Sequence, residues 1–249
     1  QGTGHGPACS GSPTIGIPAA LHLLEELPLW KRFFAELGMR VITSEGYAEA
    51  LRSGKELAGA EFCAPVTALH GHIRNLAGRC DFLFLPVVLE APSEQRRSGR
   101  LRHYCYYTQF APSIVSQINA EDIARKTLLT LFDHGSLAAA PSPALRKARE
   151  RSKRELYRVL QGVADRSLSF VRVSRAYDRA LAAYREGRQR LQQVYHRNCG
   201  RNGDVEVVLA GRPYQVLTRE MNKGIPDIFA ALGIRTYWQD MLTPLTEFS

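Results

Sequence analysis

The feature that most constrains the fold is a strand–helix–strand pattern that occurs near both ends of the chain. The first copy has a β-prone run at 14–18, an apolar helical pattern from Leu23 to Leu37, and a second β-prone run at 39–42. The apolar side chains of the helix recur at three- and four-residue spacing, and Gly38 is predicted to end it. Such a unit implies parallel strands joined by a right-handed crossover.

The second copy has the same parts in the same order: a strand at 205–210, a turn at 211–214, a helix at 225–232 and a strand at 234–237. In both copies 22 positions separate the glycine of the first strand or turn from the glycine after the helix, Gly16 and Gly38 or Gly211 and Gly233. We interpret the two copies as two units of similar construction.

The chain between the copies is predicted to complete the first unit. The predicted parts are a helix at 61–76, a strand at 81–88, a surface loop at 90–102, an aromatic segment at 104–107, a short element beginning at 114–118, a helix at 122–132 and a helical stretch at 144–197 broken near 167–174. The nearly continuous apolar run at 81–88 suits a strand that is buried on both faces of a parallel sheet. The predicted fold class is therefore α/β, with a Rossmann-like parallel sheet and flanking helices.

The composition and the pattern divide the chain into four segments. They are a flexible linker at 1–13, a Rossmann-like α/β domain at 14–140, a basic helical connection at 141–203 and the beginning of a second α/β unit at 204–249. About 45 residues are too few for a complete doubly wound domain, so we expect this chain to be a piece of a larger protein. With neither a signal peptide nor an apolar stretch of about 20 residues, a cytoplasmic location and no membrane partner are expected.

The chain has five cysteines, which are odd in number and widely spaced, so they are not expected to form a disulfide framework. They are expected to be reduced thiols with roles in packing, metal ligation or redox chemistry. Cys63 lies at the N-terminus of the helix predicted at 61–76, whose dipole would stabilise a thiolate there. Both Cys63 and Cys105 could equally be buried apolar cysteines, whereas Cys9, Cys80 and Cys199 are interpreted as incidental.

The net charge of +9 lies mainly in one segment. Between Arg146 and Arg201 sixteen Lys or Arg side chains stand against five Asp or Glu, a local charge of +11 that leaves −2 for the rest. Clustered arginines with interleaved tyrosines can bind nucleic acid. Because the arginines are spread around amphipathic helices and interrupted by acids, a solvated helical face is favoured, and an acidic protein surface or a CoA phosphate is as plausible a partner as RNA.

Two short motifs have both a functional and a structural interpretation. His70 and His72 could bind zinc, but no further ligands stand at suitable spacing, and a helix would point the rings about 200° apart. Helix packing, or contact with a neighbouring site, is preferred. The turn at 211–214 follows a strand, where open α/β sheets bind ligands, and Arg212 with Lys223 could hold a phosphate or carboxylate. A rigid turn with a packed Tyr214 remains the alternative.

Three groups of residues together resemble a known family. They are Ile15-Gly16-Ile17-Pro18 with Leu27-Pro28-Leu29-Trp30 and Phe33-Phe34; Cys63-Ala64-Pro65-Val66 with His70-Gly71-His72-Ile73 and Asp81-Phe82-Leu83-Phe84-Leu85-Pro86; and Gly211-Arg212-Pro213-Tyr214 with Asn222-Lys223-Gly224-Ile225-Pro226. In that order they resemble the uncharacterised domain of long acyl-CoA dehydratase activase proteins, which is similar in turn to subunits of 2-hydroxyacyl-CoA dehydratases. The resemblance covers roughly residues 14 to 240.

The resemblance implies a [4Fe-4S] cluster held through three cysteines, two from an earlier domain and one from a later domain. Cys63 and Cys105 stand where the first two ligands would be, and the third is expected beyond Ser249, so a cluster could be absent from this piece alone. The implied partners are the remaining domains of a larger activase or dehydratase protein and an acyl-CoA substrate. Gly211, Arg212, Tyr214 and Lys223 would shape a ligand-binding or interdomain surface.

The sequence contains neither a phosphate-binding Gly-x-x-x-x-Gly-Lys-Ser/Thr loop nor a Gly-x-Gly-x-x-Gly fingerprint, so no ATPase activity is assigned. No general acid, base or nucleophile is identified either. The function expected is that of a non-ATPase, iron–sulphur-associated component of a dehydratase or activase system. A catalytically silent structural or interaction domain is the first alternative, and a nucleic-acid-binding protein using the basic helices is the second.

Overall fold

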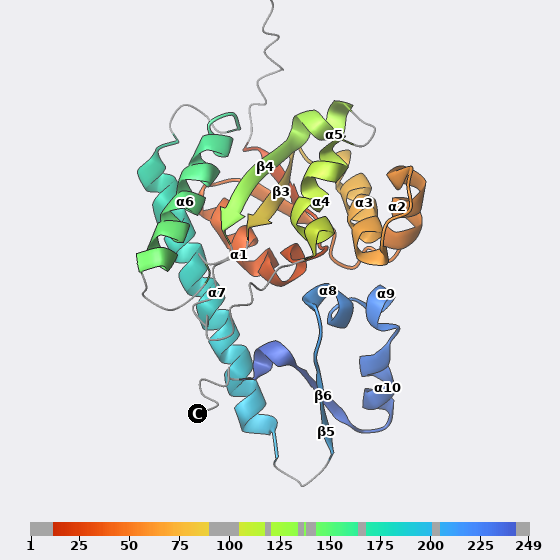
Figure 1. Cartoon of the computed structure of the whole chain (residues 1–249). Helices are drawn as coiled ribbons and strands as arrows, with labels where there is room; N and C mark the ends of the chain where they lie inside the picture. Colours follow the sequence, from red (N-terminus) through yellow and green to blue (C-terminus); the bar gives the residue numbers. More distant parts are fainter. Residues whose placement is uncertain are drawn as a thin grey trace, which may run out of the picture.

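The computed structural model describes residues 12–89, 105–117, 121–133, 137, 143–163, 168–200 and 205–242. Two α/β lobes are joined by a long helix (Figure 1). We call residues 12–163 the first lobe and residues 205–242 the second lobe. Most of the predicted linker at 1–13, with Cys9, and the predicted loop at 90–102 lie outside the described residues.

The first lobe contains a four-stranded parallel sheet. Its strands are β1 (Thr14–Ile17), β2 (Arg40–Thr43), β3 (Phe82–Leu89) and β4 (Thr127–Asp133), in the order β2-β1-β3-β4. Thr14 lies opposite Arg40 in one pair of strands, and Leu83 lies opposite Thr127 in another. Along the chain, β2 is added on one side of β1, and β3 is then added on the other side of β1. The topological switch point, where such sheets bind ligands, is therefore between β1 and β3.

Helices cover both faces of this sheet. They are α1 (Leu23–Glu36), α2 (Ala50–Ala58), α3 (Ala64–Ala77), α4 (Tyr106–Gln117), α5 (Glu121–Lys126), α6 (Pro143–Leu160) and α7 (Phe170–Asn198). Phe84 of β3 belongs to a core with α1, α6 and α7, whereas its neighbours Leu83 and Leu85 belong to a second core with α3 and α4. Trp30 is fully buried in the first core, 4.6 Å from the ring of Phe84. The predicted α/β fold class, with β3 buried on both faces, is confirmed.

Two glycines allow α2 and α3 to pack in unusually close contact. A Cβ atom added at Gly71 would lie 1.9 Å from the carbonyl oxygen of Ala50, and one added at Gly54 would lie 1.8 Å from that of Thr67. Both distances are far below any real contact, so only glycine fits at either position. Gly71 stands between the two histidines on α3, and helix packing therefore explains why that motif contains a glycine.

The predicted helix at 122–132 is wrong over most of its length. The helix α5 ends at Lys126, and the next seven residues form β4. Pairing with β3 continues from Thr127 to Asp133, and it buries Leu128 and Phe132 on the sheet. This long-range pairing overrides the local helical pattern. The predicted short element beginning at 114–118 is instead the last turn of α4, which starts at Tyr106.

The second lobe is a smaller parallel unit. Its elements are β5 (Glu206–Leu209), α8 (Pro213–Val216), α9 (Arg219–Asn222), α10 (Ile225–Ala231), β6 (Arg235–Trp238) and the 3-10 helix η3 (Gln239–Met241). The strands pair in parallel, with Glu206 opposite Arg235. Gly233 follows α10 at φ +72° and Gly38 follows α1 at φ +79°. The two predicted strand–helix–strand copies therefore end their helices in the same left-handed conformation.

The helix α7 contacts both lobes (Figure 1). Its first half packs on α1 and α6 through a buried stripe of Val173, Ala176, Tyr177, Ala180, Leu181 and Tyr184. Near its other end the ring of Tyr195 lies 5.0 Å from that of Tyr237 in β6. Within the described residues, none of the helices is both long enough and apolar enough to span a bilayer.

Candidate inter-lobe cysteine site

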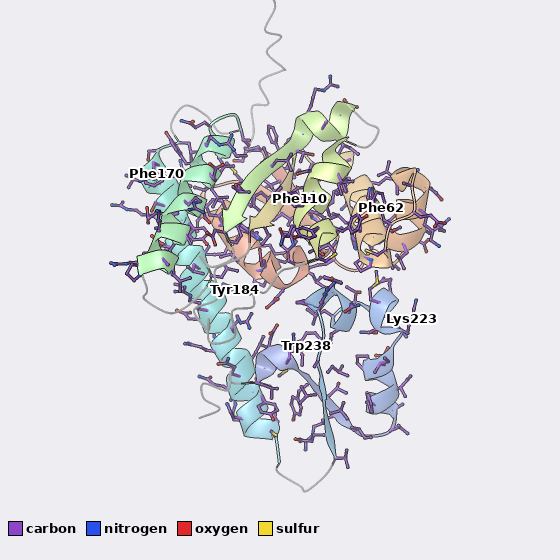
Figure 2. All side chains as sticks on the ribbon, in the orientation of Figure 1. Phe62, Phe110, Phe170, Tyr184, Lys223 and Trp238 are labelled. Carbon is purple, nitrogen blue, oxygen red and sulfur yellow. The ribbon has the colours of Figure 1, made fainter. Side chains whose placement is uncertain are left out.

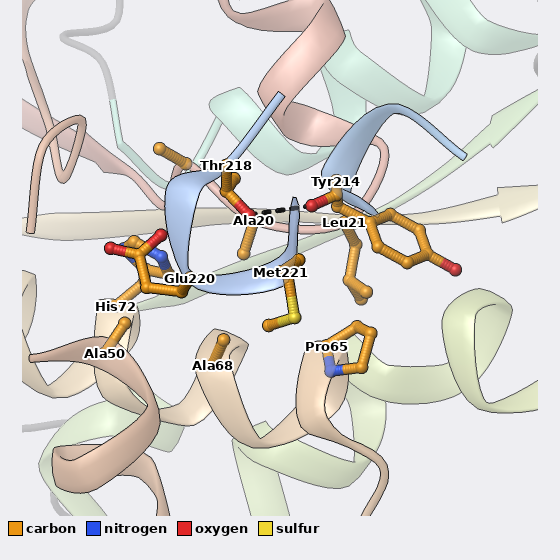
Figure 3. Close-up of a pocket in the computed structure, with 11 residues that line it drawn as sticks. Ala20, Leu21, Ala50, Pro65, Ala68, His72, Tyr214, Thr218, Glu220 and Met221 are labelled. Atoms are coloured by element: carbon orange, nitrogen blue, oxygen red, sulfur yellow. Dashed lines mark hydrogen bonds between the residues drawn. The ribbon is translucent and has the colours of Figure 1, made fainter. Parts of the chain in front are cut away.

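The carboxyl end of the first sheet faces the second lobe. Ala20 and Leu21, which follow β1, form one wall of a small cavity, and Tyr214, Thr218 and Met221, which follow β5, form another. Figure 3 shows α9 on one side of this cavity and Pro65 and Ala68 of α3 on the other. The cavity volume is about 20 Å³, which fits a single water molecule. The lobes therefore meet where a ligand-binding cleft is expected in this type of fold.

The two cysteines of the predicted ligand set both stand at the beginning of a helix. The carbonyl oxygen of Cys63 accepts hydrogen bonds from the first turn of α3, and Pro65 lies in that turn. The carbonyl oxygen of Cys105 accepts hydrogen bonds from Thr108 and Gln109 of α4, at 2.8 and 3.1 Å. Cys63 is exposed, and Cys105 is half-buried. Each helix directs its positive dipole end toward its cysteine.

An aromatic contact brings the two helix starts together. The ring of Phe62, next to Cys63, meets the ring of Tyr107 edge-on with centroids 6.4 Å apart. Phe62 also stacks on His70 at 5.3 Å, so it is fixed from the α3 side. Cys63 and Cys105, which are far apart in the sequence, are thereby placed on neighbouring segments.

Arg212 approaches both cysteines from the second lobe. Its guanidinium donates a 2.9 Å hydrogen bond to the hydroxyl of Tyr214. This bond, and the charges of Tyr214, Cys105 and Cys63, raise the pKa of Arg212 above its ordinary value. Both sulphurs therefore lie within electrostatic range of the guanidinium. The ring of Tyr214 is only 6% exposed and packs in the core that includes Val66 and Leu69, so it anchors the turn to the first lobe.

The other two predicted residues, Gly211 and Lys223, differ in their surroundings. The backbone of Gly211 exchanges two hydrogen bonds with the side-chain amide of Gln239, at 3.2 and 2.8 Å, which holds the turn to the end of β6. Lys223 ends α9 at φ +55° and is exposed (Figure 2). Nothing in the described part of the chain places its ammonium group beside the cysteines, and its role stays a prediction.

The two histidines of α3 are buried. His70 is completely buried with Nδ1 2.8 Å from the carbonyl oxygen of Val66, and burial lowers its pKa. His72 borders the inter-lobe cavity, and burial lowers its pKa to about 4, against the opposing effect of a hydrogen bond to the backbone of Ser44. No group of three or more His, Cys, Asp or Glu side chains in the described residues is arranged to hold a metal ion.

The cysteine site meets part of what an iron–sulphur cluster needs. Thiolates are the usual protein ligands of such clusters, and Cys63 and Cys105 present two thiols beside a cation and two helix N-termini. Two ligands are fewer than the three that the family resemblance implies. Within the described residues the other thiols do not supply a third, because Cys80 is buried with its Sγ donating to the carbonyl of Leu76, and Cys199 lies at the far end of α7.

Sequence reasoning did not predict the Phe62–Tyr107 contact or the burial of Tyr214. An aromatic residue close to each cysteine was the available signal, but its partner could not be known without the fold. Basic side chains of these helices are often paired with acids of the same molecule, as in Arg179 with Glu36 and Lys153 with Asp178. These pairs give several of the positive charges a structural role.

Residues 14–242 match the family model described as the CoA enzyme activase uncharacterised domain. The chain belongs to this family. No curated protein and no solved structure matches the chain. The match spans both lobes and the helix between them, and it confirms the resemblance inferred from the three groups of residues. The cysteine site is therefore a feature of a CoA enzyme activase domain.

Proposed function

We propose that this domain is a non-ATPase, cytoplasmic component of a 2-hydroxyacyl-CoA dehydratase or activase system, and that Cys63 and Cys105 supply two ligands of a [4Fe-4S] cluster. The observation that carries the proposal is that Cys63 and Cys105 stand on neighbouring helix starts, joined by the Phe62–Tyr107 contact, and that both act electrostatically on Arg212. The family assignment supports the activase context of this proposal.

The surroundings of the two cysteines suit a negatively charged group. The N-termini of α3 and α4 and the guanidinium of Arg212 all favour negative charge at this place. When bound, the cluster would supply a low-potential electron. The residues of this chain would hold it, and Tyr214 would keep Arg212 beside it through their 2.9 Å hydrogen bond. Arg212 could also hold a phosphate or carboxylate of an acyl-CoA ligand in a two-pronged contact.

The second lobe supports the proposal that this domain works with further domains of a larger protein. In the described residues its sheet has two strands, each paired on one side only. Several of its apolar side chains are exposed, among them Ile228 at 59% and Leu232 at 68%. Open parallel strands and exposed apolar side chains of this kind are normally covered by another element. We propose that the other domains supply that cover and the third cluster ligand.

The test is anaerobic purification followed by iron and sulphide analysis and EPR of the reduced protein. It compares the wild type with the double variant Cys63→Ser, Cys105→Ser, in this chain and in a longer chain that includes its neighbouring domains. Cys199→Ser is the matched control, because this half-buried thiol lies at the C-terminal end of α7, away from the cleft. We expect a four-iron signal in the longer wild-type chain that survives Cys199→Ser and disappears in the double variant.

The cluster proposal is wrong if neither this chain nor the longer chain contains iron when the protein is well folded and reduced. A catalytically silent structural or interaction domain would then be the better description. Binding to RNA or DNA that weakens steeply with salt would instead support a role for the basic helices, since each duplex phosphate contact contributes a log–log slope of about −0.9.

A further inference from the structure

One arginine of the long helix joins the two lobes at a point away from the cysteines. The guanidinium of Arg188 on α7 lies 2.5 Å from a carboxylate oxygen of Glu25 on α1 and 3.3 Å from one of Asp240 on η3. Glu25 belongs to the first turn of α1 in the first lobe, and Asp240 belongs to the second lobe. A single side chain therefore ties an element of each lobe to the helix that connects them.

The two acids of this cluster are also direct neighbours. Both contact the same guanidinium, Glu25 at 2.5 Å and Asp240 at 3.3 Å, so the two carboxyl groups are held close together. Burial, and then the charge and hydrogen bond of Asp240, raise the pKa of Glu25 to about 7, although Arg188 acts in the opposite direction. Two carboxylates in contact cannot both ionise without a large cost, and one arginine neutralises only one of them.

Few other titratable groups face this cluster. From α7 the hydroxyl of Tyr184 accepts a 3.4 Å hydrogen bond from Arg188, and burial raises the pKa of Tyr184. From α1 the adjacent Glu26 accepts a hydrogen bond from the indole of Trp30 at 2.8 Å, and His22 stands in the preceding turn. From η3 the acid is Asp240 itself. Glu25 is the carboxyl group of this cluster whose pKa is raised to near neutral.

The cluster and the Tyr214 anchor attach the second lobe at different places. The ring of Tyr214 packs in the core of the first lobe. The 3-10 helix η3 packs against α7, and Figure 1 shows α8, which contains Tyr214, below α4. A change at Glu25 leaves the Tyr214 anchor in place and alters how firmly the lobe is held at the cluster.

We propose that Glu25, Arg188 and Asp240 form a proton-controlled latch that sets how tightly the second lobe closes over Cys63 and Cys105. In the closed arrangement Glu25 is protonated beside Asp240 and Arg188. Loss of that proton leaves two carboxylates on one guanidinium, and the second lobe is held less tightly. The latch is built from residues of this chain alone, and it does not depend on whether a cluster binds.

The direction of the pH effect follows from proton linkage. In the closed arrangement the pKa of Glu25 is about 7, whereas its ordinary pKa of 4.5 applies once the lobes separate. Between these two pKa values the closed arrangement binds more protons than the open one. Closure is therefore favoured at pH 5 and weakens as the pH rises through 7. The ratio of closed to open molecules is expected to fall roughly 70-fold between pH 5 and pH 8.

The test is hydrogen exchange of η3 and α8, corrected for the intrinsic effect of pH, with small-angle scattering as a second readout. We expect wild-type protein to lose protection in η3 and become less compact between pH 5 and pH 8. Glu25→Gln keeps a neutral hydrogen-bonding group, so it should stay protected at both pH values. Glu36→Gln is the matched control, since Glu36 stands on the same helix but pairs with Arg32 and Arg179.

The variant Asp240→Asn tests the same latch from the other lobe and should also remove the pH response. If wild-type η3 is equally protected at pH 5 and pH 8, the proposal is wrong. It is also wrong if Glu25→Gln and Asp240→Asn, both folded by circular dichroism, keep the wild-type pH response. Loss of the response in Glu36→Gln would show that α1 as a whole, and not the latch, carries it.

Discussion

The two lobes are built from the same strand–helix–strand unit but differ in how completely they are covered. The first lobe has four strands with a core on each face, and its largest side chains, such as Trp30 and Phe33, are fully buried. The second lobe has two strands in the described residues, and Ile225, Ile228 and Leu232 of its helix segment are exposed. Thus the first lobe can stabilise itself, whereas the second depends on Tyr214, on Arg188 and on contacts with other elements.

The two tryptophans of the chain provide the sharpest test of this difference, because one lies in each lobe. Trp30→Ala should lower the free energy of unfolding by about 4 kcal/mol, since it removes a fully buried ring from the core. Trp238→Ala should cost about 1 kcal/mol, because this side chain is only half-buried. Urea denaturation followed by circular dichroism measures both. Equal losses in the two variants would contradict the comparison.

A second test concerns the close contact of α2 and α3 in the first lobe. Gly71→Ala should destabilise the protein by about 3 kcal/mol, because its Cβ would lie 1.9 Å from the backbone oxygen of Ala50. Gly78→Ala is the matched control, at the end of the same helix, where a Cβ meets nothing within 4 Å and φ is −83°. Thermal unfolding of both variants checks the prediction. A loss for Gly71→Ala as small as that for Gly78→Ala would show that the helices separate easily.

The smallest effect is expected on the exposed surface of the second lobe. Leu232→Ser should change the free energy of unfolding of this chain by less than about 0.5 kcal/mol, because the side chain is 68% exposed. In a longer chain that contains the neighbouring domains, the same variant should cost more, since the proposed cover would bury Leu232. Chemical denaturation of both lengths gives the comparison. The same small effect in both would mean that this surface stays uncovered.

Much of the fold could be predicted because local patterns and long-range packing agree there. The run from Phe82 to Leu89 is apolar at nearly every position, which suits a strand covered on both faces, and the structure places it there. The prediction failed at β4, where the same local pattern fits a helix or a strand. Only its pairing with β3 decides between them. The helix α2 was missed because Gly54 and its polar residues hide a helix that is held by contact with α3.

The candidate site was predicted as separate residues, not as an arrangement. Cys63, Cys105 and Arg212 could be named from the residue types and the family resemblance, with the helix N-terminus at Cys63 and the turn after a strand at Arg212 as further signals. Their meeting could not be derived, because it depends on the ring contact of Phe62 with Tyr107 and on the insertion of Tyr214 into the first lobe. These contacts join segments that are distant along the chain, and no local pattern encodes their distances.

The sequence by itself determined the α/β class, the two similar units and the family, since each rests on periodicity or on short motifs within one segment. The tertiary structure alone decided that the carboxyl end of the first sheet meets the second lobe, that both cysteines act electrostatically on Arg212, and that Glu25 and Asp240 share one arginine. The physical reason is that burial and charge interactions depend on distances in space. Those distances are set only when α7 holds the two lobes together.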